Sequence, residues 1–244
     1  MEERWFVLRN NLVPAVTPLA FLWMIIAVAL ASGCATKGRL VRQEVKAGYG
    51  LWAQNRFEEV AAAYQRAIAL DPNDAHAGRL LARVYEDAGH PDQALALFQQ
   101  LLRDQPNNRR VVADFLWFCA DHAWWPHGDD ETVVLQEGIL AGEKAIQRWP
   151  SDPELLEALG WLFHKIGQTE RAEMLYQKAV AYEKTPQRLY GLSIVFSKMG
   201  HRNQAVAAYQ EAMALQQQTE PESIYEKGFR QVAETMLQGM PSQE

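Results

Sequence analysis

Apolar residues between Pro153 and Ala181 recur three and four positions apart in two successive blocks. The apolar positions of the first block are Leu156, Leu159, Gly160 and Phe163, and those of the second are Ala172, Leu175, Tyr176 and Ala179. This spacing places each set on one face of an α-helix. The stretch Ile166-Gly167-Gln168-Thr169, which contains a glycine, separates the blocks, so we predict two amphipathic helices joined by a short turn.

The same two-helix pattern returns along the chain. The counterparts of Ala172 are spaced by 34, 44, 34 and 33 residues, and they are Val60, Ala94, Gly138, Ala172 and Ala205. Prolines end the second helix in three of the units, at Pro72, Pro106 and Pro150. We therefore predict five helix pairs, which begin near residues 41, 75, 109, 153 and 186.

A repeat of this length, built from two helices, resembles the tetratricopeptide repeat (TPR) family. The resemblance implies an all-α fold over residues 41–220, a right-handed superhelical α-solenoid of about five TPR helix pairs. One pair cannot bury its apolar face alone, so neighbouring pairs stack. The resemblance also implies a scaffold for protein binding, but it leaves the partner open.

Two segments depart from the repeat. The third pair is about ten residues longer than the TPR period, and the excess lies near residues 121–130, where Trp124 and Trp125 are adjacent. These tryptophans either pack onto the array or contact a partner. Residues 221–244 carry the apolar stripe Ile224, Phe229, Val232 and Met236, which predicts a C-terminal cap helix over the fifth pair, followed by a short tail.

The N-terminal segment differs from the rest of the chain. Its apolar core from Leu19 to Ala31 is 13 residues long, which suits a signal peptide better than a membrane span of about 20 residues. The sequence Leu30-Ala-Ser-Gly-Cys34 resembles the bacterial lipobox, in which the cysteine is lipidated and becomes the mature N-terminus. We therefore predict a signal peptide over residues 1–33 and a tether over residues 34–40 that carries lipid on Cys34.

A signal anchor is the alternative, because the 18 residues from Pro14 to Ala31 could cross a bilayer. Both interpretations place the repeats outside the cytoplasm, in the bacterial cell envelope. Ala35 rather than Asp follows Cys34, and by resemblance to Gram-negative lipoproteins this favours the outer membrane, facing the periplasm. The net charge of −6 argues against nucleic acid as a partner.

In the TPR family, ligand contacts favour set positions on the first helix of each pair, which lines the inner surface of the superhelix. By register these positions hold aromatic and basic residues, the types that dominate binding energy at interfaces. They are Tyr49, Trp52, Arg79, Arg83, Arg110, Trp117, Trp161, His164, Lys165, Tyr190 and Lys198. We expect Trp161 and Arg83 to be the main anchors, and Trp124 with Trp125 to be the rival site.

Two alternatives stay open for these residues. Some of the aromatic side chains, such as Tyr49 and Trp117, could belong to the core instead. Arg83 and Arg79 lie four residues apart on one helix, where Glu86 and Asp87 could neutralise them locally.

Other chemistry has little support in the sequence. Thiolate, imidazole and carboxylate side chains occur together at Cys119, His122, His127, Asp129 and Asp130, and all three types ligate zinc. Their spacing is irregular, and Cys119 falls on a core position, so we predict no metal site. The chain has no nucleophile elbow, no H-E-x-x-H motif and no phosphate-binding loop, so we predict neither an enzyme nor a cofactor.

The sequence therefore favours an envelope lipoprotein that binds a protein partner and assists the assembly or stability of a complex. Similar TPR lipoproteins act in pilus secretin assembly and in outer-membrane protein insertion. The alternative is a carbohydrate binder of a polysaccharide or peptidoglycan system, with Trp52, Trp117 and Trp161 stacked on sugar rings. A surface of exposed tryptophans with carboxylates would favour sugar, whereas mixed aromatic and basic side chains would favour peptide. The oligomeric state stays open.

Overall fold

The computed structural model describes residues 36–122, 131–218 and 224–240. All regular structure in these ranges is helical, as the sequence predicts. The chain divides into two compact units, residues 1–77 and residues 78–244, which are described separately below. Cys34, Trp124 and Trp125 lie outside the described residues, as do the predicted signal peptide and the centre of the insertion.

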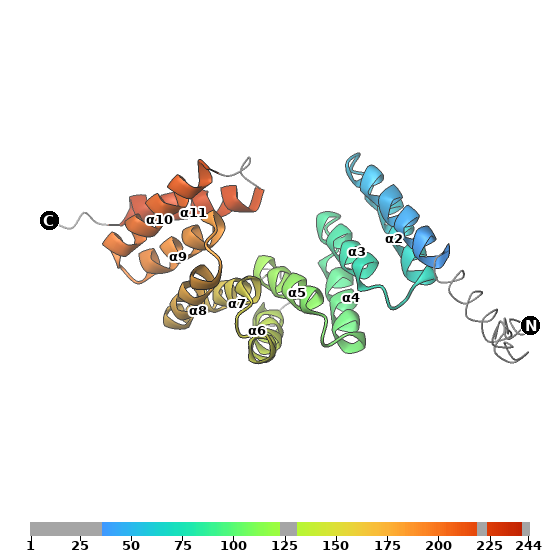
Figure 1. The fold of residues 1–244 in the computed structure, drawn as a ribbon, viewed down its shortest axis with the longest axis horizontal. Helices are drawn as coiled ribbons and strands as arrows, with labels where there is room; N and C mark the ends of the chain where they lie inside the picture. The colour runs from blue at the N-terminus through green and yellow to red at the C-terminus, as the bar shows by residue number, and fades with distance from the viewer. Residues whose placement is uncertain (1–35, 123–130, 219–223, 241–244) are drawn as a thin grey trace, which may run out of the picture. The chain divides into compact units, whose positions relative to one another are not determined.

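The first unit pairs a helix over residues 36–52 with α2 (Phe57–Leu70) (Figure 1). Residues 36–40 are helical, so the predicted tether is shorter than expected and the first helix does not start near residue 41. Tyr64 of α2 packs on Gly48, where a Cβ atom would overlap the tyrosine ring. Gly48 therefore lets the two helices approach closely, with Tyr64 fully buried between them.

The second unit holds four further helix pairs and a final helix, and α3 starts just before the boundary between the units. The helices are α3 (Ala75–Asp87), α4 (Pro91–Asp104), α5 (Arg109–Asp121), α6 (Glu131–Arg148), α7 (Pro153–Lys165), α8 (Thr169–Tyr182), α9 (Pro186–Lys198), α10 (Arg202–Gln216) and α11 (Ile224–Gly239). The odd-numbered helices α3 to α9 are the first helices of their pairs, and they begin where the repeat spacing predicts.

The predicted repeat register is confirmed by burial. The five counterparts of Ala172 are all buried, and they are Val60, Ala94, Gly138, Ala172 and Ala205. In α6 this position and the one a turn later are glycines, Gly138 and Gly142. A Cβ atom on Gly138 would overlap Cys119 of α5, and one on Gly142 would overlap Leu159 of α7. The second helix of the long third pair, α6, is thus packed tightly against α5 of the same pair and against α7 of the next pair.

Local signals set the ends of the first helices. Gly89, Gly167 and Gly200 follow α3, α7 and α9 with φ of 76°, 78° and 79°, a left-handed conformation that glycine adopts without strain. Side-chain oxygens accept hydrogen bonds from free backbone N–H groups at the start of α5, α7 and α9, and they belong to Asn108, Asp152 and Thr185.

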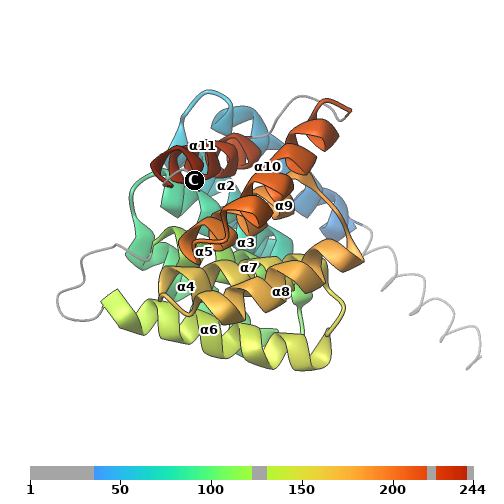
Figure 2. The ribbon, with the colours of Figure 1, turned by 90° about the vertical axis from the view of Figure 1, so that its left-hand side faces the viewer.

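The final helix, α11, lies against α9 and α10 (Figure 2). Phe229 and Ala233 are its buried residues, and both pack with Tyr190 of α9, so the predicted helix over the fifth pair is present. The expected burial of Val232 is wrong, because its side chain is 43% exposed. The helix presents positions 229, 233 and 236 to the array, one helical face that leaves position 232 at its edge.

Candidate binding surface

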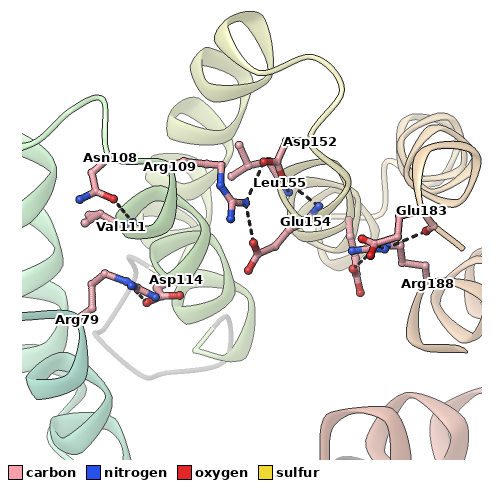
Figure 3. Close-up of polar contacts among 11 residues, drawn as sticks. Arg79, Asn108, Arg109, Val111, Asp114, Asp152, Glu154, Leu155, Glu183 and Arg188 are labelled. Atoms are coloured by element: carbon pink, nitrogen blue, oxygen red, sulfur yellow. Dashed lines mark hydrogen bonds and ion pairs between the residues drawn. The ribbon is translucent and has the colours of Figure 1, made fainter. Parts of the chain in front are cut away.

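Ion pairs join the first helices of successive pairs in the second unit (Figure 3). Arg79 Nε of α3 lies 2.5 Å from Asp114 Oδ2 of α5. Arg109 Nη1 of α5 lies 2.9 Å from Asp152 Oδ2 and 2.8 Å from Glu154 Oε2, at the start of α7. Because Asp152 also caps α7 through its other oxygen, this contact fixes both the register and the beginning of that helix.

The third connection is buried. Arg188 Nε of α9 donates to Glu157 Oε2 of α7 over 3.0 Å, and their side chains are 8% and 4% exposed. Gln187 also donates to Glu157, and Arg188 Nη1 donates to Glu183. Burial raises the pKa of Glu157 to about 7, while the Arg188 guanidinium opposes the shift. The three contacts link α3, α5, α7 and α9 in one row.

Aromatic side chains from three helices meet on this row. We call Trp117 of α5, Trp161 and His164 of α7, and Phe229 of α11 the aromatic cluster. The Phe229 ring lies 4.8 Å from the Trp161 ring and 6.2 Å from the Trp117 ring, at which it points edge-on. The His164 ring stacks on Trp161 at 4.8 Å. Both tryptophans are half-buried, and the Phe229 ring of α11 packs against both of them.

Electrostatics at the aromatic cluster favour neutral groups in its interior and cations at its edge. Burial lowers the pKa of His164 to about 4, and Lys165 and Lys198 lower it further through repulsion of the imidazolium form. His164 is therefore neutral at pH 7, and its Nδ1 atom is buried without a hydrogen-bond partner among the described residues. The Lys165 ammonium lies 5.2 Å from the centre of the Trp161 ring, and Lys165 and Lys198 are both exposed.

One predicted contact residue, Tyr190, is buried in this structure. Tyr190 is 0% exposed, its ring packs against Tyr209 at 5.6 Å, and its hydroxyl lies 3.1 Å from Met213 Sδ. Its register position points into the interface between α9, α10 and α11 rather than toward a partner, because α11 covers that part of α9.

The two arginines of α3 are engaged within the chain. Arg79 binds Asp114, as described above, which makes it a link between first helices. Arg83 Nε lies 3.8 Å from Glu86 and 3.7 Å from Asp87, so the local neutralisation considered from the sequence does occur. Burial raises the pKa of Glu86 to about 8, against the lowering effect of Arg83. Arg83 is still exposed, and its role as an anchor stays a prediction.

The remaining predicted contact residues differ in exposure. Arg110 of α5 is exposed. In the first unit, Tyr49 is 48% exposed and Trp52 is half-buried, and both rings meet Tyr64 edge-on at 6.3 Å and 6.5 Å. Tyr49 therefore offers a free ring surface, whereas Trp52 is partly in the core of its unit. Both stay predictions for a partner contact.

Of the cluster considered for zinc, the structure describes Cys119 and His122. Cys119 is fully buried, and this burial raises the pKa of its thiol well above the usual range. The His122 ring stacks on Phe118 at 4.5 Å, and its Nδ1 lies 3.7 Å from Glu86. Among the residues that the structure describes, no group of three or more His, Cys, Asp or Glu side chains could hold a metal ion. His127, Asp129 and Asp130 lie outside these residues.

A cavity of about 880 Å³ opens between α4, α5 and α6, away from the aromatic cluster. Phe115 and Trp149 lie in its wall, and Arg103, Lys144 and Arg148 contribute cations. This cavity could not be predicted from the sequence, because its walls come mainly from second helices, which the family pattern assigns to the outer face.

Profiles of the tetratricopeptide repeat match this chain at residues 51–113 and residues 155–188. The second match covers α7 and α8, the pair that contains the two apolar blocks between Pro153 and Ala181. The chain is a tetratricopeptide repeat protein. The helix pairs, the buried register positions and the glycine turns described above are the structural form of these repeats.

Solved TPR proteins share the fold. A thermophilic TPR protein of Thermus thermophilus is 20% identical, with a TM-score of 0.65 over 80% of this chain and 99% of that one. PilF of Pseudomonas aeruginosa is 16% identical, with a TM-score of 0.59 over 82% and 90% of the two chains. MamA of Desulfovibrio magneticus is 14% identical, with a TM-score of 0.57 over 74% and 97%. At these identities the likeness extends to the fold only.

A curated relative adds a different indication. Cellulose synthase operon protein C of Pseudomonas fluorescens is 31% identical to this TPR protein over 128 residues. The match covers 51% of this chain but 9% of that protein, so this chain resembles only a small part of it. None of the helices in the described ranges is both long and apolar enough to span a membrane.

Two features of this surface were not predicted from the sequence. The first is the buried Glu157–Arg188 pair, which had a readable signal, because Glu157 stands inside the apolar run from Leu155 to Leu159. A carboxylate at a buried helix position needs a partner. The second is the contact of Phe229 with Trp117 and Trp161, which joins residues far apart in the chain and left no local signal.

Proposed function

We propose that this TPR protein is a protein-binding scaffold, anchored in the bacterial cell envelope by lipid on Cys34, that assists the assembly or stability of an envelope complex. Its binding site is the face of the second unit formed by α5, α7 and α9, which we call the first-helix surface. The anchor rests on the short apolar segment and the lipobox-like sequence that ends at Cys34.

The observation that carries the binding role is the aromatic cluster with its flanking cations. Trp161 and Trp117 are large apolar anchors, and Lys165 and Lys198 stand exposed beside them. Aromatic and basic side chains in such an arrangement are typical of protein interfaces. Because ion pairs already link the first helices beneath, a partner binding here would not have to bring these helices together first.

A role in a polysaccharide system is the second candidate, and the likeness to cellulose synthase operon protein C favours it. Direct stacking of sugar on Trp161 is disfavoured, because two residues of α7 already lie against its ring: the His164 ring stacks on it at 4.8 Å, and the Lys165 ammonium lies 5.2 Å from its centre. In such a system this chain would therefore bind a protein component rather than the polysaccharide itself. Titration with cello-oligosaccharides should leave tryptophan fluorescence unchanged, and a saturable change would favour the carbohydrate interpretation.

Two experiments test the proposal. Bacteria that express the full chain should incorporate labelled palmitate, and the Cys34→Ser variant should not. Equal labelling of both would exclude the lipid anchor, and an intact Met1 in the membrane fraction would indicate a signal anchor. Affinity capture from solubilised membranes should then recover a partner that Trp161→Ala weakens and that the paired variant Trp124→Ala with Trp125→Ala leaves in place.

A further inference from the structure

The C-terminal helix occupies the proposed binding site in this structure. A cap helix that continued the repeat would pack on the last pair alone. Instead, α11 reaches first helices of earlier pairs, because Phe229 contacts Trp117 of α5 and Trp161 of α7 as well as residues of α9. Three of the residues predicted as partner contacts, Trp117, Trp161 and Tyr190, therefore pack against α11.

The contacts of α11 are divided between one apolar anchor and several polar ties. Phe229 is the central anchor on the aromatic cluster, and Ala233 lies flat on α9 beside it. On the other side, Tyr209 of α10 donates to Glu234 over 2.6 Å, and Arg202 donates to the backbone carbonyl of Met240 over 2.7 Å. The polar ties hold α11 to its own neighbour α10, whereas the aromatic anchor enters the first-helix surface.

The contact of α11 with the array is mainly with α9. Phe229 and Ala233 are the buried residues among the described side chains of α11, Met236 and Leu237 are partly buried, and Val232 is exposed. Because α11 lies outside the helix pairs of the repeats, it can move away without unfolding the array beneath it.

We propose that the first-helix surface is a receptor for an amphipathic helix of the protein partner, which places an aromatic residue where Phe229 now lies and displaces α11. This inference rests on the proposed function and names the chemistry of the partner: a helix with one aromatic anchor at the centre of its apolar face. The general mode is a helix that lies in an apolar groove, with α11 as the occupant when the partner is absent.

If α11 must be displaced, the affinity for an added helix depends on how firmly α11 is held. While α11 covers the first-helix surface, an added helix can bind only the fraction of molecules in which α11 has moved away. A substitution in α11 that weakens its contacts, and leaves the first-helix surface unchanged, raises that fraction. Affinity for an added helix must therefore rise when Phe229 is removed from the chain and fall when the aromatic residue is removed from the added helix.

The test uses the full chain and a fluorescent synthetic peptide with the sequence of residues 224–240. Fluorescence anisotropy should show that the Phe229→Ala chain binds this peptide about ten-fold more tightly than the wild-type chain does. A peptide in which alanine replaces the phenylalanine should not bind either chain. A second variant, Tyr209→Phe, removes only the tie to Glu234 and should give a smaller increase in affinity with the fold intact.

Two results would overturn the inference. Equal affinity of the wild-type and Phe229→Ala chains, with circular dichroism showing both folded, would mean that α11 does not compete for the surface. If light scattering shows a wild-type dimer that Phe229→Ala dissociates, the first-helix surface would bind a second copy of the chain instead. Because the peptide assay needs no envelope component, a failure of partner capture with a positive peptide result would count against the proposed function and not against the displacement of α11.

Discussion

Replacing Arg188 by methionine should leave the Glu157 carboxylate buried on α7 without its cation. The side chain of Glu157 is 4% exposed, and its remaining donor would be the amide of Gln187. Breaking a buried ion pair on one side costs about 3–5 kcal/mol, because an uncompensated charge stays in the interior. The carboxyl group limits this cost by taking up a proton.

The protonation of Glu157 makes the loss depend on pH. Its folded-state pKa of about 7 lies above the value in the unfolded chain, so its contribution to stability is present at low pH and is lost as the pH rises through 7. Removal of Arg188 takes away the main opposing influence and raises this pKa further. In the variant, the stability contributed by Glu157 keeps falling to higher pH. The difference in unfolding free energy between the variant and the wild type must therefore grow above pH 7.

Urea unfolding at pH 5 and pH 8, together with hydrogen exchange on α7 and α9, measures the effect. We expect Arg188→Met to lose about 3 kcal/mol or more at pH 8 and clearly less at pH 5. Arg66→Met is the matched control, because its exposed pair with Glu44 is worth less than about 1 kcal/mol. A loss below about 0.5 kcal/mol at pH 8, or the same loss at both pH values, would refute the reasoning.

Three other predictions concern the core. Between pH 6.5 and pH 4 the unfolded His164 takes up a proton that the folded one does not, so the folded state should lose about 3 kcal/mol, and His164→Phe should flatten this slope in urea titrations. The added Cβ atom of Gly191→Ala would overlap the Tyr176 ring and should lower the free energy of unfolding by about 1–3 kcal/mol. Gly228→Ala lies in open space on α11 and should raise the melting temperature. Equal losses of stability in the two variants would contradict this packing. In a Cys34→Ser chain the buried Cys119 should react with a thiol reagent only as the protein unfolds, and immediate labelling in native buffer would contradict its placement.

The sequence allowed the helix pairs to be predicted because their signals are local. The three-and-four spacing around Ala172, the turn at Gly167 and the prolines after second helices each act within a few residues. Apolar faces that recur at a fixed period can only be buried by stacking, so the fold class followed as well. The bounds of α2 and α7 match the pattern closely, and the clear difference at the start of the array is the helical stretch over residues 36–40.

The binding surface was less predictable, because it depends on contacts between distant segments. Register placed Tyr190 on the partner side of its helix, but α11 covers that position, and no local pattern reveals how a final helix is rotated. The same rotation exposes Val232 and directs Phe229 onto Trp161. Arg79 was predicted for a partner but faces Asp114, because charges on neighbouring first helices come together only after stacking.

Photo-crosslinking in intact cells tests the central claim most directly. A photoreactive residue replaces Lys165 or Lys198, which are exposed at the first-helix surface, or Met174 or Tyr182, which are exposed on the second helix α8. The account predicts a protein adduct at positions 165 and 198 and no adduct at 174 or 182. When the illumination is repeated on solubilised membranes, excess peptide of residues 224–240 should abolish the adduct at 165 and 198. Adducts at 174 and 182 with none at 165 and 198 would contradict the claim that the first-helix surface binds the partner.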